Sequence, residues 1–80
     1  GRQAHQLELG QKVRPEGRTK EAFYLLYFMA QGAIMEEELL SFVLSLRRDE
    51  RENWCRVAPM LYLGTVSQKV QRIADLCSID

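Results

Sequence analysis

Hydrophobic and polar positions recur with a helical period through most of this 80-residue chain. The densest apolar run extends from Ala22 to Ala30, nine consecutive apolar or aromatic residues with the sequence AFYLLYFMA. A helix over this run is apolar on every side, so it needs either enclosure by its own domain or contact with a partner. Thr19 is a suitable N-cap and Gly32 a suitable terminator, which predicts a helix over residues 20–31.

The next apolar stripe predicts a second helix over residues 35–47. Three glutamates occupy its first turn, and Arg47 and Arg48 close its last, which is the order of charges that a helix dipole favours. The apolar positions recur every three or four residues, as expected for a helix with one buried side. They are Met35, Leu39, Phe42, Val43 and Leu46.

Residues 50–63 form the third predicted helix. Asp49 is placed as its N-cap, with Glu52 reaching back in a capping box, and Gly64 is placed as its terminator. Pro59 removes one backbone hydrogen bond within this segment, so we expect the helix to kink or to split there. The apolar stripe comprises Trp54, Val57, Ala58 and Leu61.

A second capping-box pattern, Thr65 to Gln68, precedes a fourth predicted helix over residues 66–77. Its apolar stripe is narrow and comprises Val66, Val70, Ile73, Ala74 and Cys77. The predicted connections are short, which favours antiparallel neighbours.

These elements predict an all-α fold, a small bundle of four short helices, or of five if the N-terminal segment contributes one. We expect residues 1–18 to form an N-terminal arm, or a short helix plus a turn, and residues 19–80 to form a single helical domain.

Helical positions divide the apolar run at 22–30 into two sides. One side collects most of its small and aliphatic residues. The other side interleaves polar residues, which should meet water, with Tyr24, Tyr27 and Phe28. Two interpretations stay open. Either the helix is central and enclosed by the other helices and the arm, or the three aromatic residues form a contact surface for another protein or a second copy.

Leu40 and Leu44 lie about 100° from the main stripe of the second helix. They either widen that stripe toward a third neighbour, or join the Tyr24 side to form a groove that accepts an amphipathic helix. The partner-binding candidates are therefore Tyr24, Tyr27, Phe28, Leu40 and Leu44.

The charge is unevenly spread, although the formal net charge is zero. Residues 1–20 carry five basic and two acidic groups, whereas residues 21–52 carry three basic and seven acidic groups. A neutral chain is not typical of a dedicated nucleic-acid binder. A helix-turn-helix-like nucleic-acid-binding domain is nevertheless an alternative, in which Arg47, Arg48 and Arg51 contact phosphates. The acidic start of its recognition helix argues against it.

Catalytic chemistry is sparse. The single histidine, His5, is the one base available to a cysteine nucleophile, and nothing in the sequence places it near Cys55 or Cys77. The three adjacent glutamates point in different directions on a helix and lack a histidine partner for a metal. The glycines stand singly, so no phosphate-binding loop is present. We expect no enzymatic activity, no cofactor and no metal site.

Cys55 and Cys77 stand 22 residues apart, a spacing that matches no metal or redox motif. We expect them to act as small apolar residues in a reducing compartment, with a disulfide between them as the alternative. No stretch reaches the roughly 18 apolar residues that span a bilayer, so we expect an intracellular protein, cytoplasmic or nuclear, without a membrane partner. The chain begins at Gly1 and not at Met, which indicates a fragment or a processed piece.

The sequence therefore favours a non-enzymatic protein–protein interaction or regulatory domain. Its surplus apolar helix face would bind a partner helix or a second copy of the chain. The alternatives are the nucleic-acid-binding domain described above and a structural domain of a longer chain.

Overall fold

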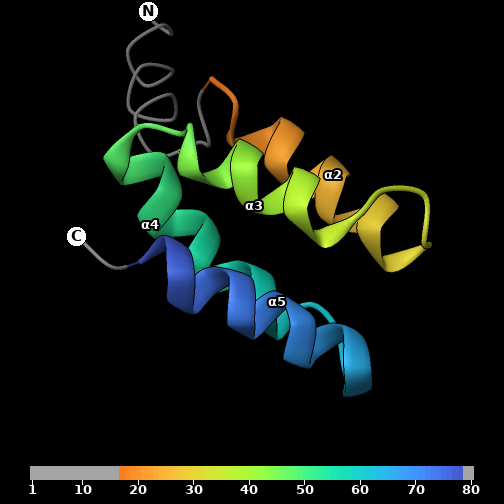
Figure 1. Ribbon diagram of the computed structural model, residues 1–80. Helices are drawn as coiled ribbons and strands as arrows, with labels where there is room; N and C mark the ends of the chain where they lie inside the picture. Colours follow the sequence, from red (N-terminus) through yellow and green to blue (C-terminus); the bar gives the residue numbers. More distant parts are fainter. Residues whose placement is uncertain (1–16, 79–80) are drawn as a thin grey trace, which may run out of the picture.

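The computed structural model describes residues 17–78, which form an all-helical bundle (Figure 1). Its elements are α2 (Thr19–Ala30), α3 (Glu36–Leu44), α4 (Arg48–Val57), a 3-10 turn η1 (Ala58–Met60) and α5 (Gly64–Cys77). The predicted all-α bundle is thus confirmed. The predicted arm lies outside the described residues, except for Gly17 and Arg18.

Helix α4 joins a hairpin of two helices to the C-terminal helix (Figure 1). Helices α2 and α3 form an antiparallel hairpin, and α4 leads from this hairpin down to α5 (Figure 1). Helix α5 packs against α3, α4 and η1, whereas α2 packs against α3 and α4. The apolar core lies between these elements, with the following fully or almost fully buried members: Ala22, Leu26, Leu39, Val43, Trp54, Ala58, Val70, Ile73, Ala74 and Cys77.

Helix α2 begins one residue earlier than predicted. Thr19 is the first helical residue and not the N-cap, because its side chain is buried and makes no capping bond. The C-terminal end agrees with the prediction. The N–H of Gly32, at φ +83°, donates to the Met29 carbonyl, and the next N–H donates to the Phe28 carbonyl. These two bonds form a Schellman motif, which requires the left-handed backbone that glycine adopts easily.

Helix α3 is shorter than the predicted 35–47. It ends at Leu44, where the Ser45 hydroxyl donates to the Phe42 carbonyl at 2.6 Å. Such a local side-chain bond competes with continuation of the helix. Arg47 therefore does not close α3 but occupies the N-cap of α4.

Helix α4 begins at Arg48, and the predicted capping pair of Asp49 and Glu52 is wrong. The residue that reaches back is Glu50, whose Oε1 accepts the N–H of Arg47 at 2.9 Å. Its other oxygen, Oε2, accepts the N–H of Arg18 at 3.4 Å. One buried carboxylate thus ties the start of α4 to the start of α2.

The third predicted helix is split at Pro59, as expected. Helix α4 ends at Val57 and the chain continues as the 3-10 turn η1. Because the helical phase is lost there, Leu61 is 53% exposed and leaves the predicted stripe. Gly64, at φ +70°, opens α5 and does not end the helix before it.

The buried stripe of α5 agrees with the prediction, but its predicted cap does not. Val70, Ile73, Ala74 and Cys77 are all buried. The N-cap is Leu63, and the expected side-chain cap from the segment 65–68 is not formed.

Trp54 connects α4 to α2 within the core. Its side chain is fully buried, and Nε1 donates to the Ala22 carbonyl at 3.2 Å. Its ring lies 6.4 Å from the Phe23 ring, centroid to centroid. The largest core side chain is therefore held by packing and by a satisfied polar atom, as a buried indole requires.

Replacing Trp54 should remove most of the stability of this small domain. We expect Trp54→Ala to lower the free energy of unfolding by about 3–5 kcal/mol, and Trp54→Phe by about 1–3 kcal/mol through the lost hydrogen bond and packing. Urea unfolding followed by circular dichroism measures both changes. Leu76→Ala, on an exposed side of α5, is the control. Wild-type stability of Trp54→Ala would contradict this account of the core.

The buried carboxylate of Glu50 should contribute more to the stability of the fold than the exposed carboxylate of Glu52. We expect Glu50→Ala to lower the free energy of unfolding by about 1–3 kcal/mol, because two backbone N–H groups lose their acceptor. Glu52→Ala, which removes only an exposed ion pair with Arg48, should cost less than about 1 kcal/mol. Equal unfolding curves for the two glutamate variants would contradict this role.

Gly17→Ala should also lower the free energy of unfolding, because φ is +55° and the added Cβ would meet Glu50 Oε2.

Candidate functional site

The outward side of α2 carries three exposed aromatic side chains. Tyr24 is 57% exposed, Tyr27 is 52% exposed and Phe28 is 44% exposed. On the inward side, Leu26 and Met29 are buried against the core. The described helices therefore do not enclose α2 on all sides. The enclosed interpretation also relied on the N-terminal arm, which lies outside the described residues.

The three residues form one surface, which we call the aromatic face. The rings of Tyr27 and Phe28 meet edge to face with centroids 5.8 Å apart, an arrangement that aromatic pairs favour. Tyr24 and Phe28 are separated by four residues and are therefore neighbours along the helix surface. The face thus presents a continuous apolar area with two phenol hydroxyl groups.

A groove lies between α2 and α3, next to the aromatic face. Its apolar floor consists of Leu25, Ile34 and Phe42, which are partly buried and pack against the core. The groove is also lined by polar residues of α3 and by the residue that follows this helix. They are Glu37, Glu38, Ser41 and Ser45. We call this feature the α2–α3 groove.

Arg18 holds one end of the α2–α3 groove. Its guanidinium lies 4.5 Å from the centre of the Phe42 ring, within the range of a cation–π contact. It also donates to the Ser45 carbonyl at 3.2 Å and to the Ser45 hydroxyl at 2.6 Å. Contacts within the chain therefore hold the Phe42 side of the groove floor in place.

The structure does not bring Leu40 and Leu44 into this groove. Both follow Glu36 at four-residue spacing, and Glu36 pairs with Lys69 and Arg72 of α5. They therefore lie on the α5 side of α3. Leu40 packs against the core, and Leu44 is 49% exposed. The predicted groove combining them with the Tyr24 side is replaced by one that uses the opposite edge of α3.

The three arginines of the nucleic-acid alternative lie around the start of α4. Arg47 pairs with Asp49 at 3.3 Å, and Arg48 pairs with Glu52 at 3.5 Å. Arg51 is partly buried and lies close enough to the two cysteines to affect their ionisation. Two of the three charges are thus offset by neighbouring carboxylates, and the alternative gains no support from the described residues.

Cys55 and Cys77 are neighbours in space, which their spacing in the sequence does not indicate. The two thiols are close enough to affect each other's pKa, and both are free. Burial raises the pKa of Cys55, and burial together with the adjacent Cys55 raises the pKa of Cys77 to about 11. Neutral thiols in such surroundings are poor nucleophiles and poor metal ligands.

No group of three or more histidine, cysteine, aspartate or glutamate side chains within residues 17–78 is arranged to hold a metal ion. None of the helices in this part of the chain combines the length and the apolar character needed to cross a bilayer.

No protein-family model, curated protein or solved structure matches this chain. The site is therefore interpreted from its own geometry.

Sequence reasoning missed the floor of the α2–α3 groove. The sequence pattern places Phe42 in the main stripe of its helix, and it does not set Leu25 apart from the other aliphatic residues of α2. One signal for the groove is present in the sequence. Glu21, Leu25 and Phe28 recur at four- and three-residue spacing on one side of α2, next to Glu38 and Phe42 on α3 in an antiparallel hairpin. This signal for the groove can be recognised only when it is known which edge of α2 meets which edge of α3.

The cysteines should react slowly in the folded protein. The rise from 9.0 to about 11 in the pKa of Cys77 means about a hundredfold less thiolate at neutral pH. We expect iodoacetamide to label Cys77 at least that much more slowly in the native chain than in urea, as measured by mass spectrometry. Equal labelling rates in the two states would contradict this difference in reactivity.

Because the pKa of Cys77 is higher in the folded chain than in the unfolded chain, the stability of the fold should fall as the pH rises from about 9 toward 11.

Proposed function

We propose that this domain is a non-enzymatic protein-binding module and that the aromatic face of α2 is its contact surface. The observation that carries the proposal is the exposure of Tyr24, Tyr27 and Phe28, each 44% or more, on successive turns of one helix. Contiguous exposed apolar surface of this kind is typical of interaction sites.

The chemistry of the aromatic face suits a protein partner. Covering apolar surface gains about 25 cal/mol per Å², and aromatic residues are enriched at the centres of interfaces. A tyrosine adds a hydroxyl that finds a hydrogen-bond partner when its ring is buried. Two of the three residues of this face are tyrosines, so the surface provides both apolar area and polar specificity.

The face is also carried by a rigid element. Ala22, Leu26 and Met29 anchor the inward side of α2 in the core, and the carbonyl of Ala22 accepts the indole N–H of Trp54. Side chains held on an anchored helix lose less conformational freedom on binding than side chains on a loop. A partner therefore meets a surface that is already ordered.

The double variant Tyr24→Ser plus Phe28→Ser tests this function. We compare three full-length chains, wild type, the double variant and a control with Leu63→Ser plus Leu76→Ser, which removes similarly exposed side chains elsewhere. Captured proteins from a cell extract and molar mass by light scattering are measured for each. We expect a partner, or a second copy, to be retained by wild type and control and lost by the double variant. The stability of both variants should stay within about 0.5 kcal/mol of wild type.

Identical captured proteins and identical molar mass for all three chains would show the proposal to be wrong. Circular dichroism establishes that each variant is folded. If the double variant unfolds, the single variant Tyr24→Ser, at the most exposed of the three positions, takes its place.

A further inference from the structure

The α2–α3 groove has an apolar floor that continues into the aromatic face. Leu25 of α2 and Phe42 of α3 line it from its two sides, and Ile34 lines it from the connecting turn. Phe28 follows Leu25 by three residues and is 44% exposed, so the apolar strip continues along α2. A second helix laid along this strip would place its own side chains between those of α2 and α3.

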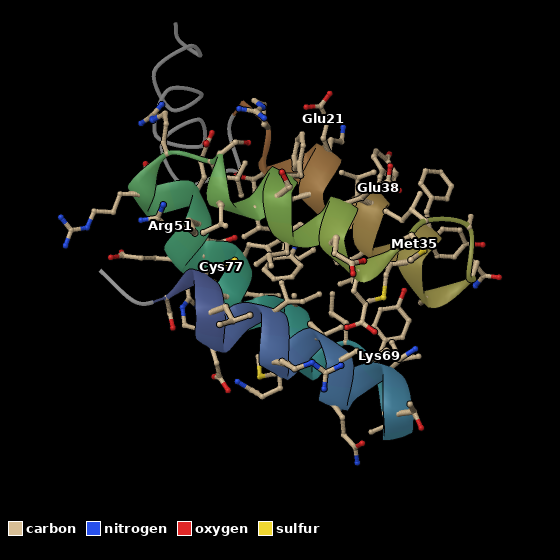
Figure 2. All side chains as sticks on the ribbon, in the orientation of Figure 1. Glu21, Met35, Glu38, Arg51, Lys69 and Cys77 are labelled. Atoms are coloured by element: carbon tan, nitrogen blue, oxygen red, sulfur yellow. The ribbon has the colours of Figure 1, made fainter. Side chains whose placement is uncertain are left out.

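Carboxylates border this floor. Glu37 and Glu38 line the groove on α3, and Glu21 precedes Leu25 by four residues on the same side of α2. Figure 2 shows Glu21 and Glu38 along the same edge of the α2–α3 hairpin. The groove therefore has an acidic border on both of its helices.

The negative charge of this border is not neutralised within residues 17–78. Glu21 and Glu37 have no hydrogen-bond or ion-pair partner there, and Glu38 accepts only the Met35 N–H, at 3.4 Å. Glu36, by contrast, is paired with two basic residues of α5 and lies on the other edge of α3. Arg18 contributes one positive charge at the Ser45 end, where its hydrogen bonds hold it.

We propose that the α2–α3 groove, together with Tyr24 and Phe28, binds a basic amphipathic helix of a partner protein. This inference rests on the proposed function and names the chemistry of the partner. The partner helix would carry apolar residues at three- and four-residue spacing toward Leu25 and Phe42, flanked by lysine or arginine residues toward Glu21 and Glu37. Helix-in-groove recognition of this kind places apolar anchors in the groove and uses flanking charges for specificity.

Charge favours a basic helix over a second copy of the chain or an anionic membrane surface as the occupant of the groove. A twofold dimer built on this groove would bring two acidic borders together, because each copy presents the same surface to the other. An anionic membrane surface would be repelled in the same way. A peptide that binds by strand addition would need an unpaired strand edge, and residues 17–78 contain no strand. A basic helix is the occupant whose charge complements the border.

Two matched peptides test the proposal directly. Both are helical, about 18 residues long, and carry leucines at the same three- and four-residue spacing. One has lysine at every polar position and the other has glutamate. We expect the lysine peptide to bind the full chain at least tenfold more tightly than the glutamate peptide at low salt, as measured by calorimetry. The difference should shrink in 0.5 M salt, because screening weakens exposed charge pairs.

Charge reversal locates the binding site. Glu21→Lys plus Glu37→Lys should weaken binding of the lysine peptide about tenfold at low salt. The control is Glu52→Lys plus Asp75→Lys, which changes the net charge equally but lies on α4 and α5. It should change the affinity by less than about threefold, which is the nonspecific effect of net charge. Circular dichroism confirms that both variants are folded.

Three outcomes would overturn the inference: equal affinity for the two peptides, equal weakening by the two charge-reversal variants, or a wild-type dimer that Phe28→Ser dissociates. The last would make a second copy the occupant. If no peptide binds but Tyr24→Ser plus Phe28→Ser still abolishes partner capture, the proposed function stands and the basic-helix inference fails. If neither effect is seen, both fail.

Discussion

The indole of Trp54 determines which side of α2 faces inward. It is completely buried, and its N–H reaches the Ala22 carbonyl on α2, so α4 and α2 are held in one relative orientation. With Ala22 facing the core, the helical period places Leu26 and Met29 inward as well. The same period then leaves Tyr24 and Phe28 outward. The exposure of the aromatic face is thus a geometric consequence of the contact that anchors the helix.

A second constraint acts where the helices begin. Glu50 receives the backbone N–H groups of Arg47 and Arg18, which belong to the first turns of α4 and α2. Arg18 in turn places its guanidinium on Phe42 and Ser45 at the end of α3. Three helix ends are therefore joined through one carboxylate and one guanidinium. This junction shapes one end of the α2–α3 groove, so the site depends on contacts that also maintain the fold.

The sequence allowed prediction of the features that depend on a periodic pattern or on one special residue. The stripe of α5, the terminator Gly32 and the split at Pro59 all follow from local rules, and the structure agrees with them. The separation of Tyr24, Tyr27 and Phe28 from the buried side of α2 also followed from helical geometry.

The caps could not be predicted in the same way. Thr19 and Asp49 match the N-cap preference, but Thr19 is buried in the core and Asp49 lies inside the first turn of α4, whose N-cap is Arg47. The residue that reaches back to Arg47 is Glu50, which also bonds to a residue 32 positions away in the chain. The α2–α3 groove was missed for a related reason. Leu40 and Phe42 lie on opposite edges of α3, and only the arrangement of α2 and α5 decides which edge meets which neighbour. Information of this kind resides in tertiary contacts and not in local spacing.

The topology explains why one side of α2 remains exposed. Helix α5 packs on α3, α4 and η1, which leaves α2 with neighbours on only part of its circumference. Folding alone does not require aromatic residues on the remaining part, since lysine or glutamate would be better helix formers at exposed positions than tyrosine or phenylalanine. The aromatic face therefore gives up some helix propensity and exposes apolar area to water without any gain to the core. Under the proposed function, a partner that covers this area would offset both costs.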